Sequence, residues 1–407
     1  MPCCAGQSLV CRLFEALIYA TATSCLVVHD QPEHSFRSGL SVLERASLAQ
    51  HLGAVSVGLP RIGARDSHTL LCMRAVAAML RQCTTVTELC LSKPCSFAVI
   101  GPARVVVASD VVLALGGCQR LRTLRLQGLT VSVESDGELA TAVAALPALE
   151  TFEASFCEWA PAARLRAALD GLAALRRVKL VHNSGLCGLP LLATVPSMRD
   201  LELADVDLSY NDAALPAGPL PLERLGIELK GAGRFNNLIR PAPCSAADVT
   251  RLVRIIRRMP GLRHLNLGVQ DVSDASKAEI FAALQCLTSL TSIELRMWVP
   301  PAFGTLPSCT QLRALTLHLL THRAEWVPAL ASLLRTCSAL TTIDFAYLRW
   351  PASDAAVADA VLPVLAQCPV LECLTVQYTS FNLVQLCRSL QHHPTLRKLQ
   401  SFVEAHV

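Results

Sequence analysis

The chain of 407 residues lacks several features that mark other classes of protein. Its net charge of +4 is too small to indicate nucleic-acid binding by itself. Its longest apolar stretch, Leu9 to Val28, is interrupted by Arg12 and Glu15, and no run of about 18 uncharged apolar residues occurs elsewhere. The N-terminus has no basic start or small-residue cleavage site of the signal-peptide type. We expect a soluble cytoplasmic protein, with the nucleus as the alternative, that binds neither nucleic acid nor a membrane.

The common catalytic and metal-binding motifs are also missing. The sequence has no G-x-x-x-x-G-K-[ST], H-E-x-x-H or G-x-S-x-G pattern and no EF-hand loop. It has 18 cysteines but no C-x-x-C pair, which argues against a zinc site. His392 and His393 are adjacent, so on a helix they would point in different directions, and no third metal ligand lies near them. We expect a protein that is not an enzyme and that holds no metal or cofactor.

What the chain does contain is one short pattern, L-x-x-L-x-L, that recurs twelve times with conservative replacements. Successive copies begin between 22 and 40 residues apart, a period that indicates leucine-rich repeats. The copies begin at Val86, Leu121, Leu149, Leu175, Met198, Leu222, Leu262, Leu290, Leu312, Leu340, Leu371 and Leu396.

Each repeat reads as a helix, a short turn and a strand, because the spacing of apolar residues changes from about 3.6 to 2 at the same point. Ser67–Arg81 has helical spacing, and a strand follows it at Thr87–Leu91. Strands of consecutive repeats are expected to pair in parallel, since the helix supplies the long crossover that this needs. The same order is predicted for Arg104–Leu115 with Arg122–Gln127, Gly137–Ala145 with Thr151–Ser155, Ala162–Leu175 with Arg177–Val181, and Glu325–Arg335 with Thr342–Ala346.

Some intervals depart from this order. The longest, of 40 residues, contains an inserted loop at Lys230–Cys244. A helix is predicted after it, with Ser245 as the N-cap and Asp248 at the third helical position. The intervals of 22 to 24 residues leave little room for a helix, so we expect extended or single-turn segments there.

Many of the cysteines share one position, three residues before the first leucine of a repeat. Other repeats place Leu146, Leu172, Met259 or Leu287 there. A position that accepts cysteine, leucine or methionine is buried and apolar, and a free thiol behaves there as a small hydrophobic group. We therefore expect reduced core cysteines at Cys83, Cys118, Cys309, Cys337 and Cys368.

The pattern L-x-x-L-x-L followed by x-x-[N/C] resembles the leucine-rich repeat family, and the intervals of 26 to 28 residues resemble its ribonuclease-inhibitor-like and cysteine-containing subclasses. The resemblance covers about residues 67–407 and implies an α/β solenoid of about twelve repeats. That solenoid would be a horseshoe with parallel strands on the concave face and helices on the convex face. In the family, Asn or Cys at the ninth repeat position satisfies backbone groups of the turn, and Cys157 and Asn183 match it.

Residues 1–66 fit the repeat less well. Leu9–Ala20 with Ser24–His29, and Ser38–Leu52 with Ala54–Leu59, still give a helix before a strand. We favour an N-terminal cap of degenerate repeats, because the end of a solenoid has no neighbour on one side. The alternative is a separate small helical module.

The resemblance also implies a function. Family members of this kind are mostly non-enzymatic scaffolds that bind a protein partner through the concave face, and this is our expectation for the chain. The alternative is a substrate-recognition subunit of a cullin-type ubiquitin ligase, in which residues 1–66 would act like an F-box and bind a ligase adaptor. A third possibility is a regulator of a partner enzyme, such as a GTPase activator or an inhibitor.

The residue between the last two leucines of each repeat should point away from the core. Aromatic residues just past the strands are a second group, since tryptophan and tyrosine are enriched at interfaces. The alternative for the outward strand positions is a solvated surface, and the alternative for the aromatic residues is that they fill gaps where the repeat turn lacks its usual residue. Trp298 stands at the ninth position and is expected in the core. The candidate partner-binding residues are Arg125, Glu153, Trp159, Lys179, Glu202, Glu294, Arg296, His318, Asp344 and Trp350.

Overall fold

The computed structural model contains two compact units, Met1–Met198 and Arg199–Val407, which are described separately. The residues that it describes are 26–28, 54–58, parts of 74–92, 109–131, 133–159, 163–183, 195–206, 218–229, 245–269, 272–297, 310–318, 326–346, 355–377 and 383–402.

The first unit is built on a parallel sheet whose described strands follow one another in chain order. The register is continuous, since Leu89 of one strand lies beside Leu124 of the next, and Leu124 lies beside Phe152. A second sheet of two short strands lies beyond the ends of the longer strands. The main strands are β1 (Leu26–Val28), β2 (Ala54–Gly58), β3 (Glu88–Ser92), β4 (Thr123–Gln127), β6 (Thr151–Ser155) and β8 (Arg177–Val181), and the short ones are β5 (Thr130–Val131) and β7 (Glu158–Trp159).

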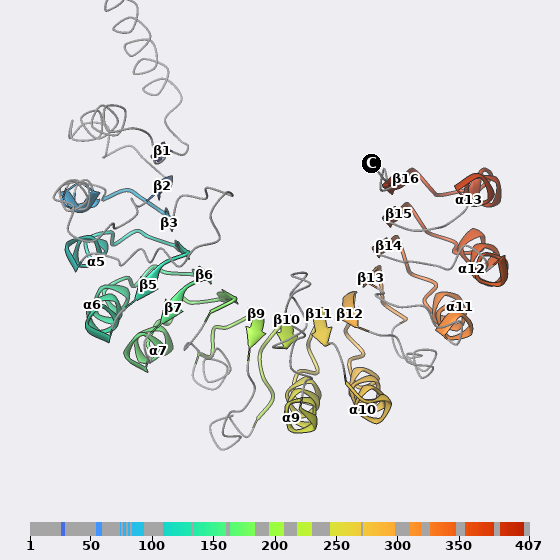
Figure 1. Ribbon diagram of the computed structural model, residues 1–407, viewed down its shortest axis with the longest axis horizontal. Helices are drawn as coiled ribbons and strands as arrows, with labels where there is room; N and C mark the ends of the chain where they lie inside the picture. The colour runs from blue at the N-terminus through green and yellow to red at the C-terminus, as the bar shows by residue number, and fades with distance from the viewer. Residues whose placement is uncertain are drawn as a thin grey trace, which may run out of the picture. The chain divides into compact units, whose positions relative to one another are not determined.

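The helices of the first unit lie along one side of its sheet, as the crossovers between parallel strands (Figure 1). They are α5 (Ser109–Leu115), α6 (Val133–Ala144) and α7 (Ala163–Asp170). The segment predicted as a helix before β3 has helical backbone at its described positions, and Val76, Ala77 and Leu80 are buried there.

The second unit repeats the same plan. Its strands also pair in parallel and in chain order, and its helices lie on one side of the sheet. The strands are β9 (Asp200–Val206), β10 (Arg224–Leu229), β11 (His264–Val269), β12 (Ser292–Met297), β13 (Ala314–His318), β14 (Thr342–Ala346), β15 (Cys373–Gln377) and β16 (Lys398–Phe402). The helices are α9 (Ala246–Arg257), α10 (Asp274–Leu284), α11 (Trp326–Thr336), α12 (Ala355–Ala366) and α13 (Leu383–Leu390).

The repeated leucines form the core of both units. The first residue of each repeat from Val86 to Leu371 is at most 1% exposed, and the aromatic rings of Phe152 and Phe345 replace two of the leucines without becoming accessible. At β16 the pattern weakens, since Leu399 is 38% exposed. Burying a leucine or phenylalanine side chain contributes about 1.5–3 kcal/mol, so this ladder is the main source of stability.

The backbone fixes the register between repeats. In most of the described steps, the carbonyl oxygen of the second repeat residue accepts two N–H groups from the next repeat. Thr87 accepts from Arg122 and Thr123, for example, and Glu223 accepts from Arg263 and His264. Because main-chain atoms make these bonds, the spacing of the strands does not depend on which side chains stand on the sheet.

Several predicted details are confirmed. The strands β6, β8 and β14 have the predicted bounds. Ser245 caps α9, and its hydroxyl oxygen accepts a hydrogen bond from the Asp248 amide at 3.1 Å. Cys118, Cys337 and Cys368 are buried and form no disulfide, whereas Cys83 and Cys309 lie outside the described residues.

Other details differ from prediction. Helix α7 was expected to continue to Leu175, but it ends at Asp170, and the turn that follows sets Leu175 against the Leu172 carbonyl. Helix α6 begins at Val133, before the predicted Gly137. The inserted loop and the segments within the shortest intervals lie outside the described residues.

Candidate partner-binding face

The third, fifth and seventh residues of each repeat stand on the side of the sheet opposite the helices. We call this side the outward face. The register confirms that the predicted outward positions fall in one row, since Arg125 lies beside Glu153 and Glu153 beside Lys179. In the second unit the same row is Glu202, Gly226, Asn266, Glu294, Thr316, Asp344, Thr375 and Gln400.

A charged cluster occupies the outward face of the first unit. The Nε of Arg125 donates to Oε2 of Glu153 at 3.0 Å, and Glu88 lies 3.9 Å from the same guanidinium. The other oxygen of Glu153 lies 3.7 Å from Nε of Arg177. The four side chains come from β3, β4, β6 and β8, so Glu153 holds two arginines of neighbouring strands in place. We call Glu88, Arg125, Glu153 and Arg177 the first cluster.

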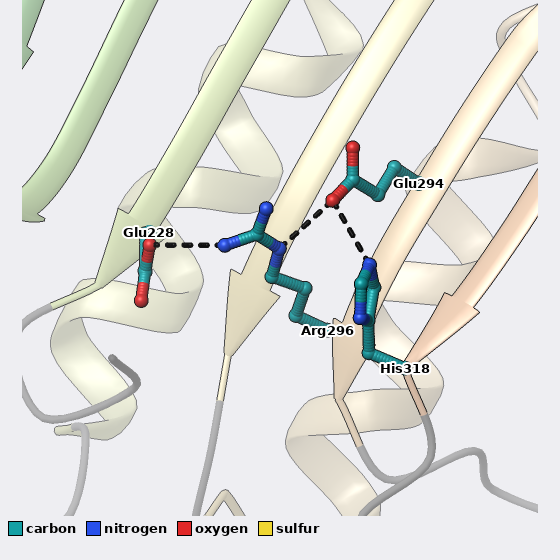
Figure 2. Close-up of polar contacts among 4 residues, drawn as sticks. All are labelled: Glu228, Glu294, Arg296 and His318. Atoms are coloured by element: carbon teal, nitrogen blue, oxygen red, sulfur yellow. Dashed lines mark hydrogen bonds and ion pairs between the residues drawn. The ribbon is translucent and has the colours of Figure 1, made fainter. Parts of the chain in front are cut away.

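A second cluster occupies the outward face of β10, β12 and β13 (Figure 2). One carboxylate oxygen of Glu294 accepts from Nε of Arg296 at 2.8 Å and lies 3.1 Å from Nε2 of His318. Arg296 also extends to Glu228, with 3.8 Å between Nη1 and Oε2. We call Glu228, Glu294, Arg296 and His318 the second cluster. Its two carboxylates lie on both sides of the guanidinium, so both signs of charge meet at this part of the outward face.

A glycine makes the second cluster possible. Glu228 and Arg296 lie on strands separated by β11, and the register places Gly268 directly between them. A Cβ atom at Gly268 would lie 2.9 Å from Cγ of Glu228, so a side chain there would push the glutamate away. At Gly226 a Cβ atom would similarly meet Glu202 at 3.0 Å. Glycine at these outward positions therefore lets two glutamates lie across the backbone of the neighbouring strand.

Burial and neighbouring charges shift two titratable groups of the second unit. Burial raises the pKa of Glu294, but the hydrogen bond from His318 and the charge of Arg296 more than offset it, so the pKa lies below its ordinary value. Burial lowers the pKa of His264, and Arg224 lowers it further while Asp200 partly opposes this. At neutral pH Glu294 is therefore a carboxylate that accepts from two cationic or donor groups.

The structure places the predicted site residues in different ways. Arg125 and Glu153 meet in the first cluster, and Glu294, Arg296 and His318 meet in the second. Lys179, Glu202 and Asp344 stand in the outward row as half-buried side chains outside either cluster. Trp350 and Trp298 lie outside the described residues.

Trp159 requires a correction, because its ring is 6% exposed and belongs to the core. The residue lies on β7, which pairs with β5, and its indole N–H donates to the side-chain oxygen of Asn183 at 3.1 Å. A buried, hydrogen-bonded ring offers no surface to a partner. The pairing of β5 with β7 is a contact between two repeats that the local sequence pattern does not predict.

Asn183 and Cys157 act as the family resemblance implies. The Asn183 amide donates to the Ala154 carbonyl at 2.7 Å and accepts from the Cys157 amide at 3.2 Å. The Cys157 thiol lies 3.6 Å from the Leu126 carbonyl, the equivalent acceptor one repeat earlier. Burial raises the pKa of Cys157 above its ordinary value, as expected of an inert structural thiol.

Sequence reasoning did not select Glu88, Glu228 or Gly268. Glu88 and Glu228 occupy the third and seventh repeat positions, where the same alternation rule applies, so that rule could have found them. The role of Gly268 depends on the register of three strands, which only the structure supplies. Within the described residues, no helix is both long and apolar enough to cross a bilayer, and no group of three His, Cys, Asp or Glu side chains is arranged to hold a metal ion.

No protein-family model and no curated protein matches the chain. Among solved structures, the crystal structure of a TLR13–ssRNA13 complex is similar, with 15% sequence identity and a TM-score of 0.43. The match covers 89% of this chain and 52% of that one, so the chain spans about half the length of that protein. At these values the likeness says nothing of function. The repeated pattern, the parallel register and the helical crossovers themselves show the α/β architecture of a leucine-rich-repeat solenoid.

Proposed function

We propose that this chain is a non-enzymatic scaffold that binds a protein partner on the outward face of its sheets. The observation that carries the proposal is the pair of ordered charge clusters on strands whose other side is the core. Charged groups fixed in this way favour specificity and fast association more than raw affinity. A protein partner suits the face because each cluster mixes both signs of charge, whereas a nucleic acid would be repelled by the interleaved carboxylates.

Three further points support narrower proposals. Strand β1 pairs with β2 in parallel, and β2 pairs with β3, which supports residues 1–66 as degenerate repeats that cap the solenoid rather than as an adaptor-binding module. Helices of 7 to 12 residues between the strands support the ribonuclease-inhibitor-like subclass. The described cysteines form no disulfide, and four of them are buried, which supports a reducing compartment such as the cytoplasm.

The test is recovery of the tagged full-length chain from its own cell type, followed by identification of the bound proteins by mass spectrometry. A variant reverses the charges of Arg125, Lys179, Glu202 and Glu294 together, which leaves the net charge unchanged. We expect one stoichiometric partner that binds the native chain and is lost from this variant. Purified components should then reproduce the loss, with binding weakened by at least about tenfold, which corresponds to about 1.4 kcal/mol.

The matched control reverses Arg254 and Glu279, which are exposed on α9 and α10 and also leave the net charge unchanged. This variant should retain the partner. Equal loss in both variants would contradict binding by the outward face. Cullin and adaptor subunits among the recovered proteins, retained by the charge-reversed variant, would instead support the ubiquitin-ligase alternative.

A further inference from the structure

Two aromatic rings form an exposed step where β6 and β8 end. The rings of Phe156 and His182 are stacked, with their centroids 4.8 Å apart and an angle of 26° between their planes. Phe156 is 58% exposed, so one side of its ring is open to a partner. Both residues are eighth in their repeats and directly follow the last residue of a strand. We call Phe156 and His182 the aromatic step.

The backbone of the aromatic step is in a conformation that these residue types rarely adopt. Phe156 has a φ of 55° and His182 a φ of 51°, in the left-handed region. The equivalent residue of the preceding repeat is Gly128, with a φ of 68°, and glycine adopts this conformation without strain. Glycine at position 156 or 182 would therefore have a lower local conformational energy than phenylalanine or histidine. Residues held in strained conformations cluster at functional sites, so we infer that the two rings have a role other than stabilising the fold.

The surrounding structure holds the step rigidly. The Phe156 amide donates to the Val181 carbonyl at 2.8 Å, just as the Gly128 amide donates to the Ser155 carbonyl. The residue that follows His182, Asn183, accepts hydrogen bonds from the Cys157 amide and from the Trp159 indole N–H. Because these contacts fix the backbone, the rings lose little further entropy on binding. A rigid aromatic surface at low entropic cost is a common feature of binding hot spots.

Charge on the neighbouring strands indicates the kind of partner. The outward faces of β3, β4, β6 and β8 carry three basic side chains, Arg125, Arg177 and Lys179, and two acidic side chains, Glu88 and Glu153, which leaves one positive charge in excess. This excess of positive charge favours a partner segment with acidic residues. Glu153 stands between both arginines, so a regular phosphate backbone would meet a carboxylate there. The mixed pattern therefore favours a protein over a nucleic acid.

We propose that the aromatic step is a docking point for a protein partner, which places an aromatic side chain on the exposed face of Phe156 and acidic residues along the basic side chains of β4 and β8. Offset stacking of this kind adds to the apolar area that is buried. The proposal rests on the proposed function and narrows it, because it names the chemistry of the partner and the unit that binds it.

The test selects binders from a random-peptide phage library on the full-length chain and measures their affinity by fluorescence anisotropy. We expect selected peptides with an aromatic residue flanked by aspartate or glutamate. Phe156→Gly should weaken their binding at least about tenfold. The same substitution removes strain, so the Tm should stay unchanged or rise by about 2–4 °C. A purely structural Phe156 would instead lower the Tm when it is replaced.

The matched control is Leu113→Ala, which removes another exposed apolar side chain, 56% accessible, from α5. It should leave peptide affinity unchanged. Selected peptides without aromatic residues, undiminished binding by Phe156→Gly, or displacement of the peptides by oligothymidylate would each overturn the proposal. If Lys179→Glu abolishes peptide binding but Phe156→Gly does not, the aromatic step is wrong while the proposed outward-face function stands. If neither variant affects peptide binding, both the aromatic-step proposal and the proposed outward-face function are wrong.

Discussion

The two units carry similar charge clusters that are assembled differently. In the first unit, Glu153 lies on a strand between those of Arg125 and Arg177, and ordinary neighbours on adjacent strands meet. In the second unit, Glu228 reaches Arg296 across an intervening strand, over the bare backbone of Gly268. The comparison shows that ion pairs in a parallel sheet can form between adjacent strands or between strands that are separated by a third. The second kind requires a residue without a side chain on the strand between them.

The units also differ where the strands end. The first unit has residues with positive φ at three successive repeats, including Phe156 and His182, and an asparagine that ties the turn together. Within the described part of the second unit, no residue is found with positive φ. The turn of the first unit is therefore fixed by specific polar contacts, whereas the described second unit depends mainly on its buried leucines.

The largest expected effect tests whether each unit depends on its own core. Phe152→Ala and Phe345→Ala each remove a fully buried ring, one in each unit. Each should lower the free energy of unfolding by about 3–5 kcal/mol. Hydrogen exchange should show faster opening of β4, β6 and β8 in the first variant and of β13, β14 and β15 in the second. Equal acceleration in both units by either variant would contradict this separation.

Asn183→Ala should affect only the first unit. It removes acceptors and donors for the Cys157 amide, the Ala154 carbonyl and the Trp159 indole. Leaving such buried groups unpaired should cost about 2–3 kcal/mol, measured by chemical denaturation. Asn183→Asp keeps the acceptor but sets a carboxylate oxygen against the Ala154 carbonyl, so it should also destabilise the unit. An unchanged free energy of unfolding in Asn183→Ala would contradict this and would show that water replaces the lost hydrogen bonds.

Gly268→Ala tests the longer reach in the second unit. The new Cβ would displace Glu228, and the crowding should cost about 1 kcal/mol. The stronger expectation concerns coupling: Glu228→Gln should change stability in the native background but not beside Gly268→Ala, because the ion pair is already broken. Gly261→Ala is the control, since a Cβ there meets nothing within 4 Å. Additive effects of the two substitutions would exclude the coupling.

The smallest effect is the pH dependence of the second cluster. The folded pKa of Glu294 lies below its ordinary value, so its contribution to stability is fully present above the ordinary pKa of about 4.5 and is lost as the pH falls through the folded pKa. At pH 7, Glu294→Gln should cost about 0.5–1 kcal/mol, and the difference should vanish in acid. Carbon-detected NMR titration should show the pKa of Glu294 rising in Arg296→Gln. An unchanged pKa would mean that Arg296 does not stabilise the carboxylate.

Much of the fold could be predicted because the repeat is dominated by local physics. Alternating apolar residues determine a strand whatever lies beside it, so the bounds of β6, β8 and β14 follow from the sequence. The same alternation placed Arg125, Glu153 and Glu294 on one face. Contacts that depend on a second repeat were not predictable in this way.

Trp159 illustrates that limit. Its burial requires β5 of the preceding repeat and Asn183 of the following one, so no window of local sequence contains the reason. The positive φ of Phe156 could not be predicted from the sequence either, although the sequence does show that an aromatic residue follows the strand. The role of Gly268 could be inferred only once the register joined three strands.

The doubly accepting carbonyls that connect successive repeats have a consequence for how such a chain can change over time. Because the main chain alone sets the spacing of the strands, a substitution on the outward face does not disturb the register of its neighbours. The scaffold and its specificity can therefore evolve almost independently, so that one backbone can be fitted to new partners a single residue at a time.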